Sequence, residues 1–109
     1  MKYAVFTTEK AENDLKEILK YLAHTLKAGE TAIKQLERIE SAILSLDEMP
    51  ERFHIYDEEP WKTRELRVMP VDNYLVFYIA KKEEKNVMVL RVMYGRRDIP
   101  ARLNDKTEQ

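Results

Sequence analysis

The feature that most constrains this chain is a pair of apolar stripes, each with the spacing of an amphipathic helix. The first stripe has intervals of four, three, four and four residues and comprises Ala11, Leu15, Ile18, Leu22 and Leu26. The second has intervals of four, three, four and three and comprises Ala32, Leu36, Ile39, Ile43 and Leu46. Such intervals place apolar side chains on one helix face. Because few residues separate the stripes, they predict an antiparallel helix hairpin.

The ends of the two helices have their own signals. Thr7 or Thr8 precedes the first stripe, and a threonine side chain accepts a hydrogen bond from a backbone N–H at a helix start. Ala28-Gly29 is expected to close the first helix, because glycine tolerates the left-handed conformation of many helix ends. Met49-Pro50 is expected to end the second, because the residue before proline is pushed out of helical geometry.

Outside the hairpin the pattern is typical of β-strands. Residues 2–6 are rich in Tyr, Val and Phe and predict a short first strand. Residues 64–69, 74–80 and 87–94 alternate or are nearly all apolar, with turn residues between them. A sheet and a hairpin of this kind must cover each other's apolar faces. The sequence therefore predicts an α+β fold: an N-terminal strand and a two-helix hairpin packed on a three- to four-stranded antiparallel sheet.

Length and composition exclude several classes of protein. A chain of 109 residues has room for one domain, expected at 1–103, followed by a polar C-terminal tail at 104–109. There is no cysteine, and the two histidines are far apart, so we expect no metal site and no cofactor. Apolar runs stay shorter than the roughly 18 residues of a membrane span, so we expect no membrane partner and a cytoplasmic location. Glycine-rich phosphate loops and nucleophile elbows are also missing.

Charge is distributed unevenly along the chain. The formal net charge is −1, but the strand-rich part from Lys62 to Arg102 is basic. It contains Arg64, Arg67, Arg91, Arg96, Arg97 and Arg102, interleaved with Tyr74, Tyr78 and Tyr94. Arginine matches phosphate oxygens and tyrosine stacks on bases, so this group is able to bind RNA. The alternative is ordinary structure: ion pairs of individual arginines with neighbouring carboxylates, and a half-buried Tyr78.

Strand alternation limits which of these residues can meet. In a regular strand Arg91 shares a face with Val87 and Val89, whereas Tyr94 lies on the opposite face. Arg91 and Tyr94 can therefore contribute to one site only if the strand ends or bulges first.

Short motifs occur along the chain in a fixed order. They are T-x-x-A-x-x-D-L-x-x-I from Thr8 to Ile18, S-L-D-E-M-P-E-R from Ser45 to Arg52, E-P-W from Glu59 to Trp61, N-Y-L-V-F-Y from Asn73 to Tyr78 and R-V-M-Y-G-R-R-D from Arg91 to Asp98. Together, from about residue 2 to residue 103, they resemble the RelE/ParE superfamily of bacterial toxins from type II toxin-antitoxin modules. The resemblance implies a growth-arresting toxin and a cognate antitoxin that neutralises it.

The resemblance leaves two targets open. RelE-like members cut mRNA on the ribosome without metal, using a ribose 2′-hydroxyl as nucleophile, whereas ParE-like members inhibit DNA gyrase. The RelE-type pattern puts Arg97 on the arginine that stabilises charge at the scissile phosphate and Arg67 on a phosphate-contacting basic residue. Tyr94 stands where relatives often carry His, as a candidate general acid. Arg64, Arg91 and Arg96 are expected to bind nucleic acid. Glu59 before Pro60 is similar to a Glu-Pro pair whose Glu is a base in one nuclease branch.

Other residues point away from a nuclease. Tyr74 occupies a position where nuclease members usually have Arg, and loss of such a cation weakens stabilisation of the transition state. The length of the hairpin and the M-P-E-R segment favour ParE-like members. A further alternative is a catalytically inactive relative that acts only as an antitoxin-binding module.

Overall fold

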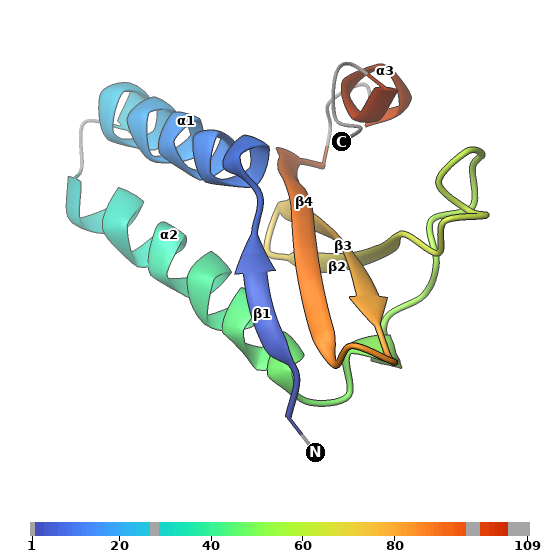
Figure 1. Ribbon diagram of the computed structural model, residues 1–109. Helices are drawn as coiled ribbons and strands as arrows, with labels where there is room; N and C mark the ends of the chain where they lie inside the picture. Colours follow the sequence, from blue (N-terminus) through green and yellow to red (C-terminus); the bar gives the residue numbers. More distant parts are fainter. Residues whose placement is uncertain (1, 27–28, 96–98, 105–109) are drawn as a thin grey trace.

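The computed structural model describes residues 2–26, 29–95 and 99–104. Its elements, in chain order, are β1 (Ala4–Thr7), α1 (Glu9–Leu26), α2 (Gly29–Leu44), the 3-10 turns η1 (Ser45–Asp47) and η2 (Pro50–Arg52), β2 (Arg67–Val71), β3 (Tyr74–Lys81), β4 (Asn86–Tyr94) and α3 (Ile99–Asn104). Figure 1 shows α1 and α2 side by side as a hairpin against the sheet, and α3 beyond the end of β4. The predicted α+β order of strand, helix hairpin and three further strands is confirmed.

The four strands form one mixed sheet in the order β1-β4-β3-β2. Strands β2, β3 and β4 form the expected antiparallel meander. β1 instead runs parallel to β4, with Ala4 opposite Asn86 and Thr7 opposite Val89. The sheet is thus not antiparallel throughout, because apolar alternation identifies a strand but carries no information on its neighbour or direction.

The hairpin covers one face of the sheet through its two apolar stripes. Ala11, Leu15, Ile39 and Ile43 pack in one cluster with the sheet residues Val76, Tyr78, Val87 and Val89. The Thr8 hydroxyl accepts a hydrogen bond from the N–H of Ala11 at 3.1 Å, which confirms the predicted helix cap. Within the described residues, none of the helices is long and apolar enough to cross a bilayer.

The link between the helices differs from the prediction. Gly29 is the first residue of α2, and no glycine in the described part of the chain has a positive φ. The expectation that Gly29 ends α1 in a left-handed conformation is therefore wrong. A helical φ suits any residue, so this glycine is not needed for that purpose. Ala28, named in the same prediction, lies outside the described residues.

A smaller apolar cluster lies on the opposite face of the sheet. Its buried members are Trp61, Leu66, Val68, Phe77, Met93 and Leu103. Leu103 comes from α3 and Trp61 from the long connection before β2, so these two segments cover part of this face. The rest of this face, toward β1, lies beyond the part that α3 and the Trp61 segment cover.

Candidate functional site: an open sheet face and its arginines

A β-bulge in β4 decides where its arginine points. Phe77 lies opposite Arg91 and Tyr78 lies opposite Val89, so Leu90 is the extra residue. The bulge shifts the alternation, and Arg91 therefore shares a face with Phe77 and not with Val89. Arg91 and Tyr94 remain on opposite faces, because the bulge precedes both of them.

Arg91 forms the main buried ion pair of the described structure. The residue is 7% exposed. Nε and Nη2 donate to the two carboxylate oxygens of Asp14 at 2.7 and 3.0 Å, and Nη1 donates to the carbonyl of Arg102 at 3.0 Å. The same Asp14 accepts the N–H of Val92 at 2.9 Å. These bonds join α1, β4 and α3, so a role for Arg91 in nucleic-acid binding would require bonds that hold the fold to break.

Arg67 is tied to the segment that follows α2. Its Nη1 donates to the carbonyl oxygens of Glu51 and Phe53 at 3.2 and 2.7 Å. Beside it, the Tyr78 hydroxyl donates to the carbonyl of Pro50 at 2.6 Å. Burial raises the pKa of Tyr78 to about 12, so this hydroxyl stays protonated and serves as a structural donor.

The candidate general acid Tyr94 lies away from Arg67. Tyr94 is opposite Tyr74, and its ring meets the Tyr74 ring edge-on with centroids 5.6 Å apart. Arg67 is opposite Tyr78, four residues further along β3. Four residues of a strand span roughly 13 Å. The bonds of Arg67 to the carbonyls of Glu51 and Phe53 hold its guanidinium at that distant position, so the two side chains do not meet in this structure. Arg96 and Arg97, the other basic residues of the predicted site, lie outside the described residues.

The remaining candidates have local partners. The Arg64 guanidinium lies over the Trp61 ring at 5.2 Å from its centroid. Glu59 accepts hydrogen bonds from the Thr63 N–H at 3.1 Å and from the Thr63 hydroxyl at 2.7 Å. These bonds hold the pKa of the Glu59 carboxyl below its usual value, whereas a general base works best with a pKa near the working pH. Glu59 thus stabilises its own turn and is poorly suited to act as a base.

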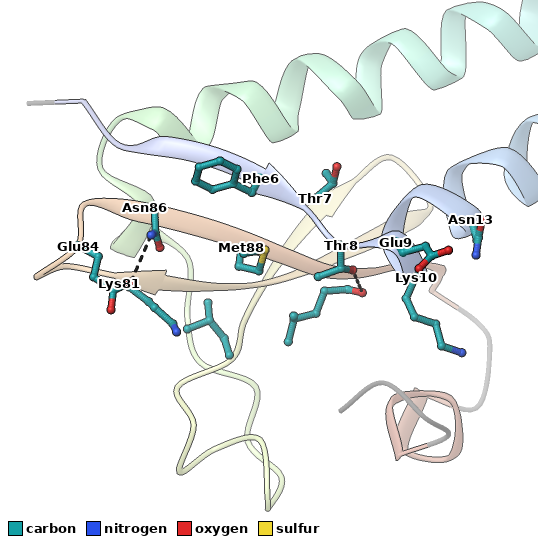
Figure 2. A pocket seen from close by; sticks show the side chains of 12 residues that line it. Phe6, Thr7, Thr8, Glu9, Lys10, Asn13, Lys81, Glu84, Asn86 and Met88 are labelled. Atoms are coloured by element: carbon teal, nitrogen blue, oxygen red, sulfur yellow. Dashed lines mark hydrogen bonds between the residues drawn. The ribbon is translucent and has the colours of Figure 1, made fainter. Parts of the chain in front are cut away.

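A groove of about 830 Å³ lies on the open part of the sheet. Figure 2 shows Phe6 and Met88 on neighbouring strands, with the start of α1 at one end of the groove and Lys81, Glu84 and Asn86 at the other. Ile79 and Leu90 complete an apolar floor. Phe6 is 48% exposed, so the groove presents apolar surface of the kind that accepts side chains of a partner.

Among the described strands, β1 is an edge strand of the sheet, and it borders this groove. The N–H groups of Ala4 and Thr8 donate to the carbonyls of Lys85 and Val89, so even-numbered residues of this segment bond to β4. The backbone groups of Val5 and Thr7 therefore point to the outer side of the sheet. Such an edge is a template for a strand of another chain. No pattern in the sequence marked Val5 or Phe6 as part of a surface, because their apolar side chains fit a buried strand equally well.

Metal ligands do not gather in this region. Within residues 2–26, 29–95 and 99–104 there is no group of three or more His, Cys, Asp or Glu side chains able to hold a metal ion. The described site thus consists of an apolar groove, a strand edge and arginines engaged within the protein.

Comparison with known proteins identifies a family that this chain matches. The family described as ParE toxin of type II toxin-antitoxin system, parDE, matches residues 5–99. Among curated proteins there is no significant match to this chain.

Three solved structures illustrate the likeness of the fold. The chromosomal ParDE toxin-antitoxin system from P. aeruginosa has a chain with a TM-score of 0.69 and 20% identity, and the match covers 85% of this chain and 96% of that one. The RelBE2 toxin-antitoxin complex from Mycobacterium tuberculosis has a TM-score of 0.60 at 20% identity, covering 86% and 92%. A mutant of the E. coli toxin RelE in the free state has a TM-score of 0.61 at 16% identity, covering 94% and 93%.

Proposed function

Because this chain belongs to the ParE toxin family of type II toxin-antitoxin systems, we propose that it arrests growth by binding and inhibiting DNA gyrase and not by cutting mRNA. The chain is a type II toxin of the RelE/ParE superfamily, within which both modes of action occur. The choice between them rests on the arginines of the sheet.

The observation that carries this proposal is the engagement of Arg91. All three nitrogens of its guanidinium donate to groups inside the protein. Arg67 is held through one nitrogen, Nη1, which donates to two carbonyl oxygens. Cleavage of an RNA phosphodiester without metal needs cations directed at the phosphate as negative charge develops there. Two arginines engaged in the fold, with Tyr74 at a third position, favour a toxin that acts by binding.

We further propose that a cognate antitoxin neutralises this toxin through the sheet-face groove and the β1 edge. The P. aeruginosa and M. tuberculosis structures are a toxin-antitoxin system and a toxin-antitoxin complex, respectively. A partner segment that adds a strand beside Val5 and Thr7 gains backbone hydrogen bonds. An apolar side chain of the same segment gains burial beside Phe6 and Met88.

The test compares the two targets in the same cells. Expression from an inducible promoter is expected to stop growth, and the product of the neighbouring gene is expected to restore it. Purified protein is expected to inhibit DNA supercoiling by gyrase, and mRNA in arrested cells is expected to stay intact. Prompt codon-linked mRNA cuts with normal supercoiling would contradict the proposal, and Arg97→Ala would then abolish the cuts. Normal growth under verified expression would favour an inactive antitoxin-binding relative.

A further inference from the structure

Met49 has a backbone conformation that its side chain does not favour. It joins η1 to η2 with φ 48° and ψ 53°, in the left-handed region. A side chain with a Cβ is strained there, and glycine or asparagine adopts this conformation more easily. Burial does not compensate the strain, because Met49 is 75% exposed. The fold thus retains a strained, apolar and exposed residue where a glycine would serve the backbone better.

Three other described residues share a positive φ, and they provide a comparison. Glu65, Asp72 and Lys85 have φ values of 61°, 55° and 53°. All three have polar side chains that are exposed to water. Among the described non-glycine residues in this conformation, Met49 is the apolar one. Strained residues that their surroundings hold in place are concentrated at functional positions, which directs attention to the methionine side chain.

The surrounding backbone is held on both sides of Met49. Arg52 donates to the carbonyl oxygens of Glu48 at 2.6 Å and Met49 at 3.1 Å. On the other side, the Tyr78 hydroxyl donates to the carbonyl of Pro50, and Arg67 donates to that of Phe53. We call the segment from Ser45 to Phe53 the Met49 turn. Because its conformation is already fixed, a partner that binds it loses little conformational entropy.

The Met49 turn also has a defined chemical surface. Leu44, just before it, is a second large apolar residue, 66% exposed. Glu48 and Glu51 flank Met49 and are exposed. A matching partner surface has an apolar socket bordered by Lys or Arg. Enzymes that bind DNA have such basic surfaces, because they hold phosphates.

We propose that the Met49 turn is a contact through which this toxin engages its protein target, with the Met49 side chain inserted into an apolar socket bordered by basic residues. The inference deepens the proposed function, since gyrase is a DNA-binding enzyme. It also separates two surfaces: the target is met at the Met49 turn, and the antitoxin is met at the sheet-face groove.

The experiment uses Met49→Gly with Glu65→Gly as its matched control. Both variants relieve a positive φ at an exposed position, so both are expected to have a Tm equal to or above that of the wild type. Met49→Gly is expected to weaken growth arrest and gyrase inhibition at least tenfold, with unchanged affinity for the antitoxin. Glu65→Gly is expected to retain full growth arrest. A second variant, Leu44→Ser, is expected to weaken arrest by a smaller factor.

Each other result has one interpretation. A Tm that is lower for Met49→Gly than for Glu65→Gly would show that the Met49 side chain stabilises the fold, and would overturn the inference. Undiminished growth arrest by Met49→Gly, or a loss of antitoxin affinity, would overturn it as well. If the wild type arrests growth without inhibiting gyrase, the proposed target is wrong. A loss of arrest by a stable Met49→Gly protein would then still support the turn as the contact with another target.

Discussion

The two faces of the four-stranded sheet are completed in different ways. Under the helix hairpin, Val76, Tyr78 and Val87 are fully buried. On the other face, Phe6 and Met88 line a groove that stays open to water. Burial of apolar surface contributes roughly 25 cal/mol per Å², so the covered face contributes most to the free energy of folding. Substitutions on the covered face are therefore expected to change stability, and substitutions in the groove are expected to change binding of a partner.

The largest expected effect on stability is at the Arg91–Asp14 ion pair, which joins β4 to α1. Asp14→Asn removes the carboxylate that pairs with the buried Arg91 guanidinium. Loss of one partner of a buried ion pair costs about 3–5 kcal/mol. Urea denaturation followed by circular dichroism would measure the decrease in the free energy of unfolding.

The control is an ion pair that is exposed to water. Asp57→Asn breaks the contact between Asp57 and Lys62, whose atoms are 3.3 Å apart. Exposed pairs contribute about 0–1 kcal/mol, so this variant should unfold nearly as the wild type does. An equal decrease for Asp14→Asn and Asp57→Asn would mean that the buried pair does not join the elements as described.

A smaller loss of unfolding free energy is expected from Tyr78→Phe, on the covered face of the sheet. This change leaves the carbonyl of Pro50 without its buried donor and costs about 1–3 kcal/mol at pH 7. The pKa of Tyr78 is raised to about 12, so the unfolded chain releases this proton at lower pH than the folded protein does. The stabilising contribution is present below pH about 10 and is lost as the pH rises through about 12.

The measurement is the difference in unfolding free energy between wild type and Tyr78→Phe at several pH values. That difference should be constant from neutral pH to about pH 9 and should narrow at higher pH. A difference that grows above pH 10 would contradict the placement of this hydroxyl.

The sequence predicted the elements better than the connections between them. Apolar stripes identified the hairpin because a helix repeats every 3.6 residues, and the same periodicity placed Ala11 and Ile39 in the core. Arg91 was misplaced because no glycine or proline marks the bulge at Leu90. Its partner Asp14 is 77 positions away in the sequence. A local pattern does not show such a pair, although an arginine inside an apolar strand is rarely buried without a carboxylate.

Phe6→Ser tests the open face. The side chain is half-exposed, so we expect a change in unfolding free energy of no more than about 1 kcal/mol. We expect affinity for the antitoxin to fall about tenfold, which corresponds to about 1.4 kcal/mol. Titration calorimetry with the protein encoded by the neighbouring gene would measure both affinity and stoichiometry.

Tyr21→Ser is the matched control for the groove. Tyr21 is 59% exposed on α1 and does not line the groove. Its replacement removes exposed aromatic surface of similar size, so antitoxin affinity should stay unchanged. Equal losses of antitoxin affinity from Phe6→Ser and Tyr21→Ser would indicate nonspecific binding through exposed apolar surface and not binding in a defined groove.

The smallest expected effect is at the margin of the covered face, where α2 meets the turn between β2 and β3. Arg38 and Gln35 donate to one Asp72 oxygen at 2.8 and 2.9 Å and hold the pKa of that carboxyl below its usual value. The ionised Asp72 carboxyl therefore contributes to stability above its unfolded pKa of about 3.8, and this contribution is lost as the pH falls through the lower pKa of the folded protein. Asp72→Asn should therefore lower the urea midpoint slightly at pH 7, and the two proteins should converge as the pH falls through the lowered pKa of the folded protein. Asparagine also tolerates the φ of 55° at this position, so a difference that persists in acid would point to packing and not to charge.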